Sequence, residues 1–185
     1  MENKGNSKDF ARKRSVKNSL QLSNLEHGRL PPQAVDLEEA VLGAMMLEKE
    51  AVNVAIDILQ PKSFYKDAHQ KIFAVIQDLF QRSEPIDLLT ITNSLRQNAE
   101  LDLVGGPYYI SQLTNKVASS ANIEFHARIV AQKYIQRELI RISSEIITDA
   151  YDETTDVFNL MDKAESGLFS VTEGNIRKNW DDMST

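Results

Sequence analysis

Cysteine is absent from the 185 residues, which excludes disulfides, thiolate catalysis and cysteine-ligated metals. Glycine is scarce, and no glycine run is followed by Lys and Ser or Thr, so the sequence lacks a Walker-type phosphate loop. Each of the histidines His69 and His126 has an apolar residue, not a second ligand, one helical turn later. We therefore expect no catalytic residue, no cofactor and no metal in this chain.

Long apolar runs are also missing. No segment approaches the roughly 20 apolar residues of a membrane span, and the N-terminus lacks the apolar core of a secretory signal. Hydrophobic residues nevertheless make up 42% of the chain, which is ordinary for a globular domain. We expect one folded, cytoplasmic domain.

The net charge of −6 is unevenly distributed. Residues 1–29 carry seven Lys or Arg against three Asp or Glu, whereas the remainder carries 14 basic and 24 acidic residues. A segment this polar buries too little surface to offset its ordering entropy, so we expect residues 1–30 to form a flexible basic tail. The tail could contact nucleic acid or could be a solvated terminus, and the sequence leaves both readings open.

Helical periodicity follows from Asp36 onward, and we find no convincing strand. Asp36 has the position of an N-cap with Glu39 as its capping-box partner, and Asp87 of a second N-cap. Glu38 and Glu39 are expected to be solvated near the helix start. Gly105-Gly106-Pro107 predicts a turn that begins a helix. The fold class is therefore all-α, with a compact multi-helix head over residues 31–121. Its helical stretches are expected from Asp36 through Met45, from Val52 to Leu59, from about Asp67 to Gln81, from the Asp87 cap through Leu95, and around Tyr108 to Thr114.

The last third predicts a long helical hairpin over residues 122–173, followed by the start of a linker at 174–185. No Pro or Gly interrupts residues 123–151, so one helix of about 42 Å can form there. Residues 152–155 predict a tight turn, and Thr155 or Asp156 can cap the second helix. So long a helix in so small a chain needs a partner for its two apolar rows, one of which packs on the second hairpin helix and the other on a second subunit. The predicted association surface comprises Ile135, Leu139, Ile142 and Ile146 of one row, Ile140, Ile147 and Tyr151 of the other, and Leu160 and Leu168 of the second helix.

Charge differs between the two ends of this hairpin. Residues 123–141 hold four basic and two acidic residues, whereas residues 145–173 hold eight acidic residues and only Lys163 as a base. The split suits complementary pairing between copies, and it is equally compatible with ordinary solvated faces.

At several points the sequence resembles the N-terminal domain of bacterial replicative DNA helicases of the DnaB type. The similarity begins at Leu30-Pro31-Pro32-Gln33 and at Asp36 to Ala44, and it covers about residues 31–170. Each motif alone is weak, whereas their joint order is specific. The later motifs are Phe64-Tyr65, His69 to Phe73, Pro85 to Leu88, Val104-Gly105-Gly106, Tyr108-Tyr109, Ser119 to Ile123 and Ala127 to Val130.

The resemblance implies a helical head and hairpin that form a collar above a hexameric motor. Hairpins of two subunits pair, and three pairs make the ring. The collar docks primase and, in some bacteria, contacts a helicase loader, while DNA is contacted weakly or indirectly. ATP and Mg belong to the family's motor domain, which these residues do not include, so we expect no ATP hydrolysis or 5′–3′ unwinding by this chain. The alternative is a stand-alone helical DNA-binding adaptor that uses the basic tail, and a hidden hydrolase has no residues in its support.

Overall fold

The computed structural model describes residues 30–117 and 120–175. The expected tail, all but its last residue, and residues 176–185 of the expected linker lie outside this part of the chain. The described helices belong to one structural unit that starts at Gln33. Within the described residues the regular structure is helical and contains no strand, so the all-α prediction is confirmed.

The head begins with two helices joined by a single residue, α2 (Val35–Leu47) and α3 (Lys49–Ile58). A 3₁₀ turn, η1 (Pro61–Ser63), leads into α4 (Asp67–Gln81), whose bounds match the prediction. The sequence then continues through the two shorter helices α5 (Leu88–Gln97) and α6 (Gly106–Asn115). A second 3₁₀ turn, η2 (Ser120–Asn122), precedes the two helices of the hairpin.

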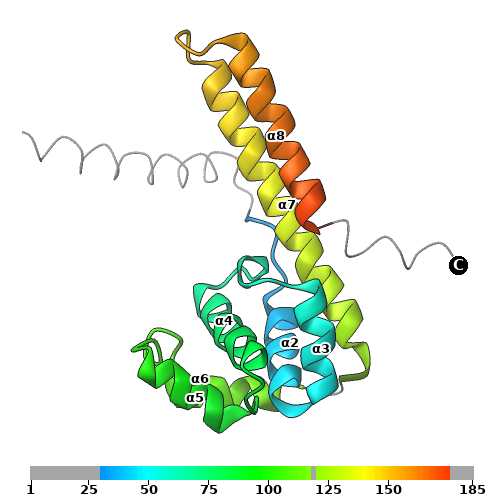
Figure 1. Cartoon of the computed structure of the whole chain (residues 1–185), viewed down its shortest axis with the longest axis vertical. Helices are drawn as coiled ribbons and strands as arrows, with labels where there is room; N and C mark the ends of the chain where they lie inside the picture. Colours follow the sequence, from blue (N-terminus) through cyan, green and yellow to red (C-terminus); the bar gives the residue numbers. More distant parts are fainter. Residues whose placement is uncertain (1–29, 118–119, 176–185) are drawn as a thin grey trace, which may run out of the picture. The chain divides into compact units, whose positions relative to one another are not determined.

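Helix α2 lies at the centre of the head, where it packs against α3, α4, α6 and α7 (Figure 1). Every residue from Val41 to Met46 is buried, which is typical of a helix surrounded by protein rather than exposed on one face. Gly43 allows the closest approach, because a Cβ there would lie 2.1 Å from the carbonyl oxygen of Leu113 on α6. The small side chain is therefore required by packing.

The ends of the helices test the cap predictions. Asp87 Oδ1 accepts hydrogen bonds of 2.9 Å from the amides of Leu89 and Thr90, so this N-cap is confirmed. The predicted capping box at Asp36 is wrong: the N-cap of α2 is Ala34, two residues earlier, and no side chain caps the helix. Gly105 has φ 97° and forms the N-cap of α6, as the glycine turn predicted.

The hairpin consists of α7 (Ile123–Ala150) and α8 (Val157–Asn175), which pack side by side (Figure 1). Asp156 caps α8 by accepting hydrogen bonds from the amides of Phe158 and Asn159. Helix α7 also serves the head, because Ile123, Ala127, Val130 and Ala131 belong to the head core. The head core thus extends past residue 121 into the range expected for the hairpin. Within the described residues, no helix combines the length and apolar character of a membrane span.

Candidate interaction surface

A network of polar side chains is buried between α2, α4 and α6, and the sequence did not indicate it. Nδ1 of His69 lies 2.6 Å from Oε2 of Glu38, and Nε2 lies 2.7 Å from the hydroxyl of Tyr109. The other Glu38 oxygen accepts a 2.7 Å hydrogen bond from the Tyr65 amide. The His69 side chain is fully buried, so no substrate can reach it, and the network joins the helices of the head rather than forming a catalytic site.

Glu39 continues this network toward the surface. Its carboxylate accepts hydrogen bonds from Lys66 and Lys116, and a 3.3 Å hydrogen bond from the Tyr109 hydroxyl. Although burial opposes it, the contacts with the two lysines lower the pKa of Glu39. Burial, followed by the charges of Glu39 and Glu38, raises the pKa of Tyr109 to about 12. The expectation that Glu38 and Glu39 are solvated is therefore wrong, because both face polar partners inside the head.

The hairpin interior contains one of the two predicted rows. Ile142 is only 4% exposed and contacts α8 where Gly167 lets the helices approach, since a Cβ on Gly167 would lie 3.0 Å from Ile142 Cγ2. Ile135, Ile146 and Leu160 are half-buried. The structure thus assigns the row containing Ile142 to the contact within the hairpin, which the sequence left open.

The second predicted row is exposed to solvent. Ile140 is 45% exposed, Ile147 is 57% exposed and Tyr151 is 85% exposed. Leu139, from the inner row, and Leu168 on α8 are exposed as well. Four further exposed apolar side chains on α8 were not among the predicted surface residues, namely Val157, Phe158, Met161 and Phe169. A helical wheel of α8 could have revealed them.

Several of these exposed residues share one flank of the hairpin. A charged groove runs along the other flank, lined by Arg141, Glu145, Lys163, Ser166 and Ser170 beside the buried contact. Since successive helical residues are about 100° apart, Leu139 and Ile147 of α7 and Met161 and Leu168 of α8 fall on the side away from that groove. We call the following set the apolar flank: Leu139 and Ile147 of α7, and Val157, Met161 and Leu168 of α8. By the same 100° spacing, Ile140 and Tyr151 lie on the outer face of α7, and Phe158 and Phe169 lie on the outer face of α8.

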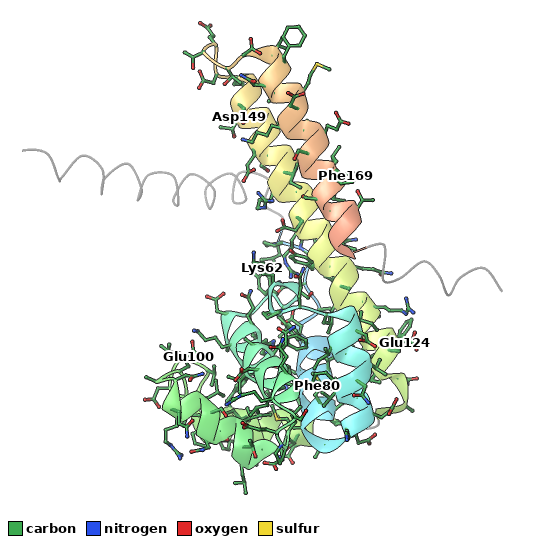
Figure 2. The ribbon with its side chains drawn as sticks, in the orientation of Figure 1. Lys62, Phe80, Glu100, Glu124, Asp149 and Phe169 are labelled. Carbon is green, nitrogen blue, oxygen red and sulfur yellow. The ribbon has the colours of Figure 1, made fainter. Side chains whose placement is uncertain are left out.

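The charged side chains of the groove form ion pairs within the hairpin. Arg141 forms ion pairs with Glu138 and Glu145 along α7, and Lys163 pairs with Asp149 across the two helices. Figure 2 shows Asp149 toward the far end of α7 and Phe169 on α8. Within the described residues, no three His, Asp or Glu side chains are grouped as a metal ion would require. The apolar flank is therefore the exposed surface of the hairpin that is suited to binding a partner, because its apolar side chains have no covering residues in the described part of the chain.

A long basic side chain ties the base of the hairpin to the head. Nη2 of Arg137 donates a 2.7 Å hydrogen bond to the carbonyl of Ser63, and its guanidinium lies 5.8 Å from the ring centres of both Tyr65 and Tyr134. The sequence indicated Arg137 only as one of several bases in the first hairpin helix.

Comparison with known proteins is consistent with this geometry. Residues 30–132 match the family described as the DnaB-like helicase N terminal domain. Replicative DNA helicase DnaB from Rhodothermus marinus is 46% identical over 151 residues, which are 82% of this chain and 16% of that protein. The DnaB of Geobacillus stearothermophilus is 40% identical over 82% of this chain and 34% of its own length. The chain therefore spans at most about a third of these relatives.

Solved structures share the same fold. The crystal structure of the N-terminal domain of DnaB helicase from Mycobacterium tuberculosis superposes with a TM-score of 0.73 at 34% identity, covering 76% of this chain and 99% of that one. A DnaB-like replicative helicase, whose structure was described together with its interactions with primase, superposes with a TM-score of 0.61 at 26% identity, over 75% of this chain and 31% of that one. With a matching family model over more than half of its residues, the chain belongs to the family of DnaB-like helicase N-terminal domains.

Proposed function

We propose that this domain mediates association between subunits of a replicative helicase, and that the apolar flank of the hairpin is the surface that a second copy covers. The single observation that carries the proposal is this flank, which places five exposed apolar side chains on one side of two packed helices. A contiguous exposed apolar surface of this kind marks an interaction site in a soluble domain. A twofold contact would let the same flank serve both copies.

The proposal includes the assembly of such pairs into a ring and the docking of primase on it. Support comes from the related DnaB-like helicase whose structure was described with its interactions with primase. ATP hydrolysis and unwinding are assigned in this proposal to the remainder of the longer relatives, because this chain carries no phosphate loop. The domain would thus act as an interaction module.

Sedimentation over a concentration series tests the association directly. We expect a species larger than the monomer for the wild-type chain and a monomer for Ile147→Glu, because a charge on the apolar flank would be buried without a partner. Ser166→Glu is the matched control, since it adds the same charge to the groove side of α8 and should keep the wild-type mass. A wild-type mass for Ile147→Glu would contradict the proposed surface.

Primase docking is tested by co-sedimentation with primase from the same organism. We expect wild-type chain and Ser166→Glu to carry primase into the faster-sedimenting species. Ile147→Glu separates two cases: loss of primase together with the larger species shows that docking needs paired hairpins, and retained primase on the monomer shows a site within one chain. If no form of the chain binds primase, this part of the proposed function is wrong.

A further inference from the structure

Helix α8 buries few of its side chains against the rest of the chain. Among its residues 157–172, only Val171 is buried. Helix α4 is comparable in length and buries six side chains, including Ile72, Phe73 and Ile76. The main packing partner of α8 is α7, through the contact of Ile142 with Gly167 and the half-buried residues around it. Tertiary packing supplies most of the stability of helices in proteins, so α8 is weakly supported.

The sequence of α8 does not compensate for this sparse packing. Gly167 lies in its middle, where glycine is about 1 kcal/mol less favourable than alanine, and residues such as Val157, Asn159 and Thr172 are poor helix formers. The Asp156 cap helps at one end. The ion pair of Lys163 with Asp149 is largely solvent-exposed, and such pairs contribute little.

Apolar side chains of α8 also lie on the flank that a second copy would cover. Met161 is 64% exposed and Leu168 is 50% exposed. Covering these two would add to the single buried side chain, Val171, among residues 157–172. The packing that α8 lacks within one chain is therefore available from the partner's hairpin.

We propose that folding of α8 is coupled to subunit association: in the isolated monomer α8 is undocked and largely unfolded, and a second copy of this chain completes it by covering the apolar flank. The inference rests on the proposed function, because it names the same surface. It adds that α8 folds onto α7 fully only when two copies associate. The head, which has its own core, stays folded throughout.

Hydrogen–deuterium exchange of the full chain, at concentrations above and below the dissociation point found by sedimentation, tests this coupling. We expect peptides from residues 157–172 to lose their protection on dilution while peptides from α4 keep theirs. In parallel, the helical circular dichroism signal per chain should fall on dilution by the share that α8 contributes. Ile147→Glu should show the unprotected α8 at every concentration, and Ser166→Glu should behave as the wild type.

The outcomes separate the inference from the function on which it rests. If the chain associates but α8 is equally protected in the monomer, the coupling is overturned and the association surface stands. If the chain stays monomeric at all concentrations, the proposed function fails and the coupling fails with it, whatever the exchange of α8. Protection lost from α4 and α8 together on dilution would show global unfolding and would also overturn the coupling.

Discussion

Tyr109 is the residue whose chemistry the head alters most. Its hydroxyl lies between His69 and Glu39, and burial beside carboxylates raises its pKa to about 12. The neutral phenol is therefore favoured in the folded state. A folded-state pKa above the unfolded value of about 10 contributes stability that is complete below pH 10 and is lost as the pH rises through 12.

The alkaline titration of tyrosine absorbance checks this prediction. We expect Tyr109 to ionise near pH 12 in the folded protein, and Tyr109→Phe to remove that part of the titration. Burial also raises the pKa of Tyr134, so Tyr134→Phe is titrated alongside it. The free energy of unfolding of the wild type should decline between about pH 10 and 12 for the same reason. Tyr108→Phe is the control, because it removes the hydroxyl of the exposed neighbouring tyrosine. A late step that is undiminished in Tyr109→Phe would contradict the assignment.

Gly43 is the residue at which packing is least tolerant. An added Cβ would meet both the backbone of Leu113 and the side chain of Val117. We expect Gly43→Ala to destabilise the head by at least about 1–3 kcal/mol, the usual range for overpacking, because a backbone carbonyl cannot rotate away. Chemical denaturation measures the change. Gly167→Ala offers the comparison: its new Cβ meets only the Ile142 side chain, whose nearest atom, Cγ2, lies 3.0 Å away, so a smaller loss is expected.

Two helix ends use residues other than glycine in a left-handed conformation. Ser83 and Ala99 both have φ 56°, after α4 and α5 respectively. At the second end the amide of Glu100 donates to the carbonyl of Leu95, and that of Ala99 donates to Arg96, which is the Schellman pattern. Glycine is the usual residue at this position because a Cβ is unfavourable there.

Replacing Ala99 by glycine should therefore stabilise the protein. We expect Ala99→Gly to raise the free energy of unfolding by about 0.5–1 kcal/mol, since relief of the left-handed strain exceeds the added entropy of the unfolded chain. Ala74→Gly is the matched control on the exposed middle of α4, where the same substitution should destabilise by about 1 kcal/mol. Equal signs for the two variants, measured by thermal or chemical unfolding, would refute this account of the helix end.

Element positions were largely predictable because they depend on neighbours in sequence. The bounds of α4, the Asp87 cap and the uninterrupted α7 follow from local periodicity and capping chemistry. The error at Asp36 has a non-local cause, since its expected partner Glu39 bonds instead to residues 27, 70 and 77 positions away. Likewise, nothing local distinguished the row of Ile142 from that of Ile147. Only the position of α8 decides which row is covered.

Apolar burial is unequal across the unit that starts at Gln33. The core runs through α2 to α6 and the first third of α7, up to Ala131. Beyond it, among residues 132–172 of the hairpin, only Ile142 and Val171 are buried. Regions with few buried contacts open at lower free energy than a packed core. The hairpin should therefore unfold before the head.

Calorimetry should resolve this difference as two transitions. We expect a lower-temperature transition from the hairpin, with a midpoint that rises with protein concentration because association stabilises the folded form, and a higher, concentration-independent transition from the head. Ile147→Glu should remove the first transition, because its α8 is already unfolded, without moving the second, since Ile147 lies on the apolar flank outside the head core. Gly43→Ala should lower the second, because its contact with Leu113 lies between α2 and α6. A single transition whose midpoint rises with concentration would instead show that α7, which runs through both parts, couples head and hairpin into one cooperative unit.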